Sequence, residues 1–243
     1  MLSPSITLVG SGEYLPVMNE VDARLLARAG HHPPRVVCFP TAAGQEGEES
    51  VNRWMQMGVE HFTRLGAEVQ ALRIIDRASA FDPQWAAPIA AADLIYFSGG
   101  DPLYLYHTLV DTPAWEAVQT ALARGAGYAG CSAGAMVMGQ QVPNVRSLRR
   151  ELHPAFGLVA AQVIMPHFDR FKLFRPMMLP QVQRELGEGF ALGIDEDTAL
   201  LNAAEAEGEV MGVGTVSVIT ARAVTVYRAG QRILFPEGGS PRG

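Results

Sequence analysis

Short apolar segments alternate with longer amphipathic ones over the first two thirds of the sequence. The apolar segments have the length of buried strands, and those at 6–9 and 36–39 each end at glycine or proline. Residues 51–65 repeat apolar side chains every three or four positions, which predicts a helix with one apolar face. A second helix is predicted at 113–124, where Pro113 stands at an early position that tolerates its missing N–H. The predicted strands of this part are 6–9, 36–39, 69–72, 93–98 and 128–130. Strands that alternate with helices predict a mostly parallel sheet covered on both faces.

The pattern changes after about residue 190. Short β-like runs then follow one another with tight connections. They lie at 191–194, 199–202, 210–213, 217–220 and 223–227. We therefore expect an antiparallel extension on one edge of the parallel sheet. Because the sequence shows neither a repeat nor a linker, we expect one α/β domain over 1–243, a three-layer α/β/α sandwich with a loose tail from about residue 236.

Charge and cysteine content narrow the function classes. The formal net charge is −6 and the 19 Lys and Arg residues are dispersed, which argues against a nucleic-acid partner. No apolar run approaches the ~20 residues needed to cross a bilayer, and the N-terminus lacks the features of a signal peptide. Cys38 and Cys131 are too few for a disulfide framework or a multi-cysteine zinc site. We expect a cytoplasmic protein without membrane association, metal or cofactor.

One pentapeptide carries candidate chemistry, Gly130-Cys131-Ser132-Ala133-Gly134. It fits the G-x-S-x-G pattern, it follows a predicted strand, and helix-forming residues follow it. In this context the serine hydroxyl points out at the carboxyl end of the strand, and the Ala133 N–H can donate to an oxyanion. The alternative is an ordinary glycine-rich turn. Cys131 is also a nucleophile type, but one position before the apex its side chain is expected to turn into the sheet as a small buried filler.

A serine nucleophile needs a base and an acid that orients the base. His167 differs from the other five histidines because it follows an apolar segment, 163–166, and the ends of parallel strands are where ligands bind. For the acid, the strand-like run 191–194 leads into three adjacent carboxylates, and spacing alone does not choose between Asp195 and Glu196. A second oxyanion donor is expected from Gly100, in a Gly-Gly turn at the end of another predicted strand.

Four segments together resemble one family, the dipeptidase E and cyanophycinase group of serine peptidases. They are Tyr96-Phe97-Ser98-Gly99-Gly100-Asp101, Gly130-Cys131-Ser132-Ala133-Gly134-Ala135, Pro166-His167-Phe168 and Gly193-Ile194-Asp195-Glu196-Asp197-Thr198-Ala199. Together with an opening strand that leads into Gly10-Ser11-Gly12, the likeness spans roughly residues 6 to 227. The resemblance implies a flavodoxin-like, class I glutamine amidotransferase-like fold. It also implies Ser132 as nucleophile, His167 as base, Glu196 as third member and the N–H groups of Gly100 and Ala133 as the oxyanion hole, with a homodimer as the family habit.

The sequence departs from the family pattern at positions that concern the substrate. Pro102 stands where cyanophycinases have Gln after Gly-Gly-Asp, and Met165-Pro166 replaces their Asp-Gln before His-Phe. Three basic residues follow His-Phe one position earlier than in cyanophycinases, which corresponds to a turn of about 100° on a helix. They are Arg170, Lys172 and Arg175. We expect substrate contacts from these three side chains, which suit a peptide carboxylate, and from Asp101.

The sequence thus predicts a hydrolase of small peptides, an exopeptidase or dipeptidase that works through an acyl-enzyme on Ser132. Amino-terminal and carboxy-terminal cleavage both remain open. An α/β-hydrolase esterase is disfavoured, because it would place its histidine after the acid and no histidine follows His167. The alternative from another class is a binding or regulatory module that keeps the amidotransferase-like fold without turnover.

Overall fold

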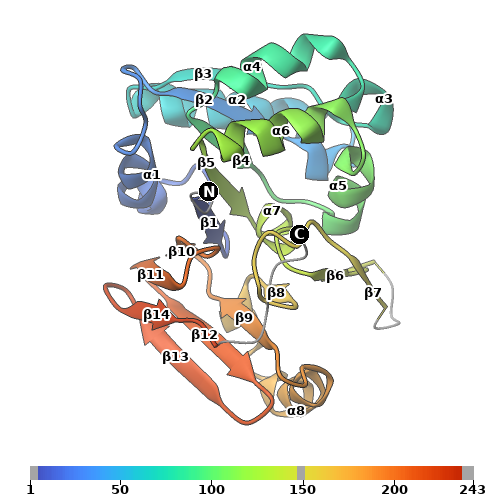
Figure 1. Cartoon of the computed structure of the whole chain (residues 1–243), viewed down its shortest axis with the longest axis vertical. Helices are drawn as coiled ribbons and strands as arrows, with labels where there is room; N and C mark the ends of the chain where they lie inside the picture. Colours follow the sequence, from blue (N-terminus) through green and yellow to red (C-terminus); the bar gives the residue numbers. More distant parts are fainter. Residues whose placement is uncertain (1–4, 147–150, 237–243) are drawn as a thin grey trace.

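The computed structural model describes residues 5–146 and 151–236, and its largest sheet has eight strands (Figure 1). The strand order is β14-β11-β10-β1-β5-β4-β2-β3. Five consecutive strands of this sheet are parallel: β1 (Ile6–Val9), β5 (Gly127–Cys131), β4 (Leu94–Phe97), β2 (Arg35–Phe39) and β3 (Glu68–Ala71). The mostly parallel α/β sheet expected from the sequence is therefore confirmed.

The helices cover both faces of this sheet because successive strand residues point to opposite sides. Ile95 and Phe97 of β4 belong to one core, whereas Leu94 and Tyr96 belong to another. The first core includes residues of α4 (Ala86–Ala91), α5 (Pro102–Leu109) and α6 (Pro113–Ala123), and the second includes residues of α1 (Asn19–Leu26) and α2 (Glu48–Arg64). The result is the expected sandwich of three layers (Figure 1).

The C-terminal strands divide between two sheets. Three of them extend the large sheet beyond β1 in antiparallel fashion: β10 (Thr198–Leu201), β11 (Glu207–Gly212) and β14 (Arg232–Leu234). The others form a second sheet, in the order β13-β12-β9-β8: β13 (Val224–Arg228), β12 (Thr215–Thr220), β9 (Phe190–Ile194) and β8 (Ile164–Met165). The antiparallel extension expected on one edge is therefore present, but it contains only part of the predicted C-terminal runs, because apolar runs identify strands but not their partners.

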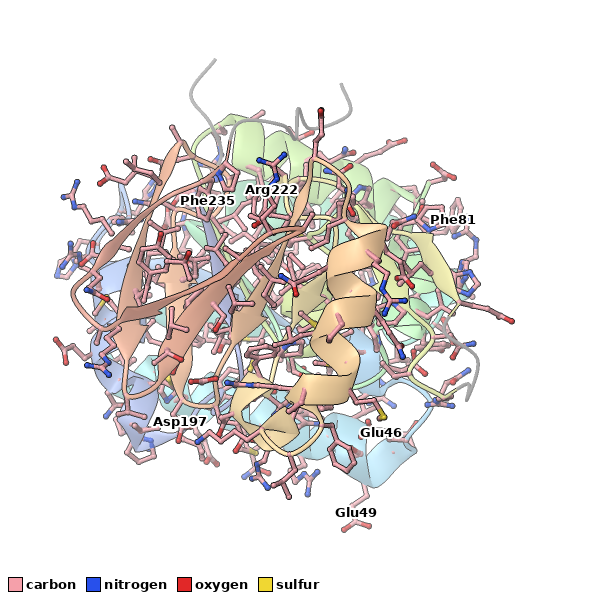
Figure 2. The ribbon with its side chains drawn as sticks, turned by 90° about the horizontal axis from the view of Figure 1, so that it is seen from below. Glu46, Glu49, Phe81, Asp197, Arg222 and Phe235 are labelled. Carbon is pink, nitrogen blue, oxygen red and sulfur yellow. The ribbon has the colours of Figure 1, made fainter. Side chains whose placement is uncertain are left out.

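Helix α8 (Arg175–Glu185) lies beside the second sheet (Figure 2), and the Gln183 side chain donates to the carbonyl of Thr220 at the end of β12, at 2.9 Å. A small separate hairpin is formed by β6 (Gln141–Pro143) and β7 (Leu152–Pro154). Short helical segments complete the described chain: α3 (Arg77–Ala80), α7 (Ala133–Met136), η1 (Pro16–Met18), η2 (Thr41–Ala43), η3 (Pro83–Trp85) and η4 (Phe168–Phe171).

The residues singled out in the sequence lie just after the ends of strands in both sheets. Gly100 follows β4, Ser132 follows β5, and His167 follows β8 of the second sheet. Glu196 lies in the connection from β9 to β10, where the chain passes from the second sheet to the first. Within the described residues no helix combines the length and hydropathy that a bilayer crossing requires. Beyond Pro236, the expected tail lies outside the described residues.

Candidate active site

Ser132 occupies a strained turn between β5 and α7. Its backbone angles are φ 50° and ψ −108°, a conformation that L residues rarely adopt. The turn is tight enough to require its flanking glycines: a Cβ on Gly130 would lie 2.3 Å from the carbonyl oxygen of Gly134, and one on Gly134 would lie 2.7 Å from that of Phe97. The chain therefore reverses sharply and presents the Ser132 side chain beyond the strand end, the geometry of a nucleophile elbow.

His167 joins Ser132 to a carboxylate. Its Nε2 lies 3.1 Å from Ser132 Oγ, and its Nδ1 lies 2.8 Å from Glu196 Oε1. The imidazole is partly exposed, at 38 % of its side-chain surface. His167 has a left-handed backbone, φ 50° and ψ 33°, at the point where the chain leaves β8 for η4. Three residues remote in sequence thus form one continuous chain of hydrogen-bonding contacts.

Glu196 is held from three sides. Its Oε1 faces His167, its Oε2 accepts from Arg170 Nε at 2.7 Å, and its backbone N–H donates to Asp169 at 2.9 Å. The hydrogen bond with His167, followed by the one with Arg170, lowers the pKa of Glu196 below its ordinary value. The carboxylate form that can orient an imidazole is therefore favoured.

Asp195, the alternative acid, has a different set of contacts. Its Oδ2 accepts from the backbone N–H of Thr215 at 2.9 Å and from the hydroxyl of the same residue at 2.6 Å. These bonds attach the β9–β10 connection to the start of β12. The structure therefore brings Glu196, and not Asp195, to the histidine, a choice that spacing left open.

Two backbone N–H groups flank Ser132 without an acceptor among the described residues, those of Gly100 and Ala133. Gly100 has φ +142°, and a Cβ there would lie 2.4 Å from the carbonyl carbon of Ala42, so the loop passes too close to η2 for any other residue. Its neighbour Asp101 donates its own N–H to Ala42. The role of the Gly100 and Ala133 N–H groups as the two oxyanion donors stays a prediction.

Behind the serine lies a buried carboxylate that the sequence analysis missed. Glu13, 8 % exposed, accepts from the Gly99 N–H through Oε1 and from the Cys131 thiol through Oε2, each at 2.9 Å. Burial first, and then the nearby Glu13, raise the pKa of Cys131 well above its ordinary value, so the thiol is not poised as a nucleophile. The place of Glu13 in the sequence could have identified it, because Glu13 closely follows β1, whose carboxyl end lies beside that of β5.

The four residues expected to contact substrate have other surroundings. Asp101 accepts from Tyr104 at the start of α5 and pairs with Arg146, while Arg170 pairs with Glu196. Arg175 stacks over the ring of Phe168 at 4.0 Å and donates to its carbonyl, and Lys172 is exposed. None of the four is among the described residues that line the cavity beside Ser132. Their role in substrate binding stays a prediction.

A cavity of about 430 Å³ opens beside the serine, and Gly100, Ser132 and His167 are part of its wall. The three residues at which the sequence departs from the family pattern, Pro102, Met165 and Pro166, also line it. The volume falls in the range of small-molecule sites. The departures from the family pattern therefore lie in the wall of the cavity beside Ser132.

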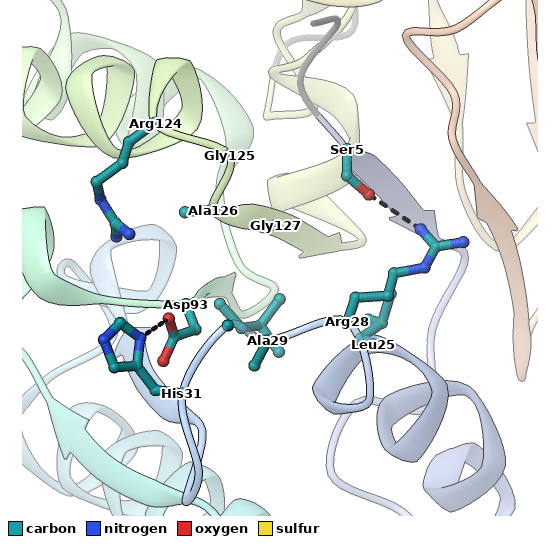
Figure 3. A pocket seen from close by; sticks show the side chains of 12 residues that line it. Ser5, Leu25, Arg28, Ala29, His31, Asp93, Arg124, Gly125, Ala126 and Gly127 are labelled. Carbon is teal, nitrogen blue, oxygen red and sulfur yellow. Dashed lines mark hydrogen bonds and ion pairs between the residues drawn. The ribbon is translucent and has the colours of Figure 1, made fainter.

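A second cavity, of about 270 Å³, lies at the opposite, amino-terminal edge of the parallel strands (Figure 3). Its charged side chains all have partners: His31 lies 2.8 Å from Asp93, Arg28 donates to Ser5 at 3.0 Å, and Arg124 donates to the carbonyl of Ala92. Among its described lining residues none has a strained backbone like that of Ser132. The cavity at the carboxyl edge is the stronger candidate for chemistry.

Comparison with known proteins finds a matching family and relatives along most of the chain. The profile of peptidase family S51 matches residues 6–207. Cyanophycinase from Geminocystis herdmanii is 26% identical over 244 residues, covering 95% of this chain and 85% of its own length. Cyanophycinase from Trichormus variabilis is 28% identical over 227 residues, covering 88% of this chain and 73% of its own length.

Solved structures give the same result at the level of the fold. A peptidase from an acI-B1 actinobacterium superposes with a TM-score of 0.85 at 36% identity, over 96% of this chain and 97% of that one. A putative peptidase E from Listeria monocytogenes superposes with a TM-score of 0.60 at 19% identity, over 93% and 99% of the two chains. The second likeness concerns the fold alone.

Proposed function

The chain belongs to peptidase family S51 and is a serine-type peptidase, and from this premise we propose that Ser132, His167 and Glu196 are its catalytic residues and that it is an exopeptidase acting on small peptides. One observation supports the proposal above all others. The Ser132 hydroxyl, the His167 imidazole and the Glu196 carboxylate form an unbroken chain with contacts of 3.1 and 2.8 Å. This is the arrangement that makes an alcohol nucleophilic at neutral pH.

In the proposed reaction Ser132 Oγ attacks the scissile carbonyl while His167 Nε2 takes its proton. Glu196 holds the proton on Nδ1, so that Nε2 is free to accept, and stabilises the imidazolium that forms. His167 then gives the proton to the departing amine, leaving an acyl-enzyme on Ser132. A water molecule, activated by the same imidazole, completes hydrolysis.

The N–H groups of Gly100 and Ala133 would stabilise the oxyanion of each tetrahedral intermediate. Both are fixed by the backbone before substrate arrives, so little reorganisation is needed, and one such donor is typically worth ~3 kcal/mol of barrier. Cys131 takes no part, because its buried thiol faces Glu13 and not the cavity. The cavity volume suits a few residues of substrate, which supports action on small peptides.

The test compares wild type with Ser132→Ala on a library of dipeptides and tripeptides, together with labelling by a fluorophosphonate. Wild type should hydrolyse part of the library and label at Ser132, whereas Ser132→Ala should do neither and unfold at the same temperature. Hydrolysis retained by Ser132→Ala would reject the assignment. A binding module without turnover would leave Ser132 unlabelled. A homodimer and a cytoplasmic location remain predictions of the sequence.

A further inference from the structure

The cavity beside Ser132 has a predominantly apolar wall. Met178 and Val182 of α8, and Leu186 at its C-terminal cap, line this wall. They are spaced four residues apart and therefore lie on one side of the helix. The adjoining strand β8 contributes Ile164 and Met165. These side chains approach from different elements, so the apolar character belongs to the site as a whole.

Part of the cavity wall is both apolar and open to water. Val145 and Leu152, from the region of the β6–β7 hairpin, are 54 and 39 % exposed, and Phe171 in η4 is 39 % exposed. All three line the same cavity. Apolar surface gathered around a concave site favours an apolar ligand, because covering it removes that surface from water.

Positive charge is missing from the described part of the cavity lining. Its ionisable residues are His167 and Glu185, and the lining includes neither Lys nor Arg. Arg146, next in sequence to Val145, is paired with Asp101. A carboxylate side chain entering this space would lose hydration, the described lining would offer it no cation in return, and Glu185 would repel it.

We propose that this peptidase selects an apolar side chain, of the size of leucine, methionine or phenylalanine, on the residue whose carbonyl Ser132 attacks, and that it rejects aspartate there. The inference rests on the proposed function, because it takes Ser132 as the nucleophile. Gly100 and Ser132 hold the carbonyl at the cavity wall. The side chain on the adjoining Cα is then within one residue's reach of the apolar wall.

The test measures inactivation of Ser132 by diphenyl phosphonate analogues of leucine, asparagine and aspartate. These side chains have similar sizes, so the series separates polarity and charge from volume, and the readout needs no turnover. The leucine analogue should inactivate about 100-fold faster than the aspartate analogue, with asparagine between them. Equal rates, or a faster aspartate analogue, would overturn the inference. Failure to react with any phosphonate and with the unselective fluorophosphonate would instead reject the proposed function.

A pair of variants on α8 tests the location of the selectivity. Met178 lines the cavity, whereas its neighbour Met177 does not and is 67 % exposed. Met178→Lys should raise the aspartate-to-leucine rate ratio by about tenfold or more, because it places a cation in the apolar wall. Met177→Lys adds the same charge one position away and should leave the ratio unchanged. An equal change in both variants would contradict selection by the cavity wall.

A different observation concerns the carboxylate behind the nucleophile. Glu13 Oε1 accepts the N–H of Gly99, the residue before the expected oxyanion donor Gly100. A Cβ on Gly99 would lie 2.9 Å from Glu13 Oε1 and 3.3 Å from Ser132 Cβ, so this loop is packed directly between the two side chains. Two adjacent glycines have little conformational preference of their own, and an external contact must hold them.

We infer that Glu13 is a positioning residue, which fixes the Gly99-Gly100 backbone so that the Gly100 N–H faces the oxyanion. Glu13→Met keeps the side-chain length but removes the acceptor, and should lower kcat by about 100-fold with little change in KM. Glu13→Gln keeps an acceptor for Gly99 and should restore kcat to within about tenfold of wild type.

Cys131→Ala is the matched control, because it removes the other partner of Glu13 and leaves the Gly99 contact in place. Its kcat should stay within about threefold of wild type. Near-ultraviolet circular dichroism would establish that each variant is folded. The inference fails if folded Glu13→Met keeps the wild-type kcat, if Glu13→Gln loses as much as Glu13→Met, or if Cys131→Ala is equally impaired.

Discussion

Two histidine–carboxylate pairs of nearly equal length lie in very different surroundings. His167 and Glu196 meet at 2.8 Å with side chains 38 and 24 % exposed, whereas His61 and Asp22 meet at 2.7 Å with side chains 1 and 0 % exposed. The second ring nitrogen of His167 faces the hydroxyl of Ser132. That of His61 faces Arg64 at 3.3 Å.

The difference shows that an oriented imidazole is not in itself a catalytic device. His61 joins α2 to α1 within the core, and its ring lies 5.8 Å from that of Tyr14 and 5.0 Å from that of Phe62. His167 instead stands at a strand end, beside a cavity and a strained serine. The first pair joins two packed helices, and the second is the pair that we propose moves a proton.

The largest effect is expected from His167→Ala. Without the base, kcat should fall by at least about 10⁴-fold, while the free energy of unfolding should change by less than about 1 kcal/mol, because the side chain is partly exposed. Steady-state kinetics and thermal denaturation measure the two quantities. If His167→Ala lost stability but kept its kcat, His167 would be a structural residue and not the base.

The second largest effect is expected from Glu196→Gln, which should lower kcat by about 10³-fold or more. Both carboxylate oxygens accept, one from His167 and one from Arg170, and an amide offers only one acceptor. The matched control is Asp195→Asn, which weakens the bonds to Thr215 and should reduce stability while changing kcat by less than about tenfold. Should Asp195→Asn prove the more damaging to turnover, Glu196 would not be the orienting acid.

His61→Ala should give the opposite outcome to His167→Ala. It leaves Asp22 buried without its partner, so the free energy of unfolding should fall by about 3 kcal/mol, while kcat per folded molecule stays within about threefold of wild type. Burial raises the pKa of Asp22, and the bond with His61 opposes that rise. Chemical denaturation, with activity referred to the folded fraction, tests both expectations.

The smallest effect is expected from Arg170→Gln. The pKa of Glu196 is lowered in the folded protein, so its carboxylate stabilises the fold above the ordinary carboxyl range, and this contribution is lost as the pH falls through the lowered value. Removing Arg170 leaves the larger contribution of His167, and the guanidinium is 71 % exposed, so the loss of stability at neutral pH should be small.

The acid limb of the stability profile should therefore move upward in Arg170→Gln, towards the ordinary pKa of a carboxyl group. Unfolding measured between about pH 3 and 6, at low and high salt, would show this shift, and salt should diminish it. An unchanged profile would mean that Arg170 does not affect Glu196 in solution.

The sequence predicts the inner strands of the parallel sheet because they are buried on both faces, as in the continuous apolar run of β4, whereas the edge strand β3 is partly exposed. It also places Ser132 at a strand end, because only small residues fit around the turn. The choice of Glu196 over Asp195 depended on resemblance, since neighbouring carboxylates differ only in where the folded chain points them. Their catalytic roles remain predictions.

Other features depend on contacts that no local pattern contains. His61 and Asp22 are 39 residues apart, and each lies in an ordinary helical context. In the sequence Glu13 follows a glycine-rich turn and resembles a surface loop residue. Its burial depends on the pairing of β1 with β5, which the local pattern does not contain. Helix α8 has Pro180 in its interior, most of its residues are exposed, and its apolar stripe faces the cavity as well as a small core cluster.

The proposed catalytic residues come from both sheets and from the chain that connects them. Ser132 is carried by the eight-stranded sheet, His167 by the four-stranded one, and Glu196 by the stretch of chain that passes between them. A slip of about 1 Å between the sheets would separate hydroxyl from imidazole and leave both sheets intact. The turnover number therefore depends on how the two sheets are aligned. On warming, kcat should fall at a lower temperature than the one at which either sheet unfolds.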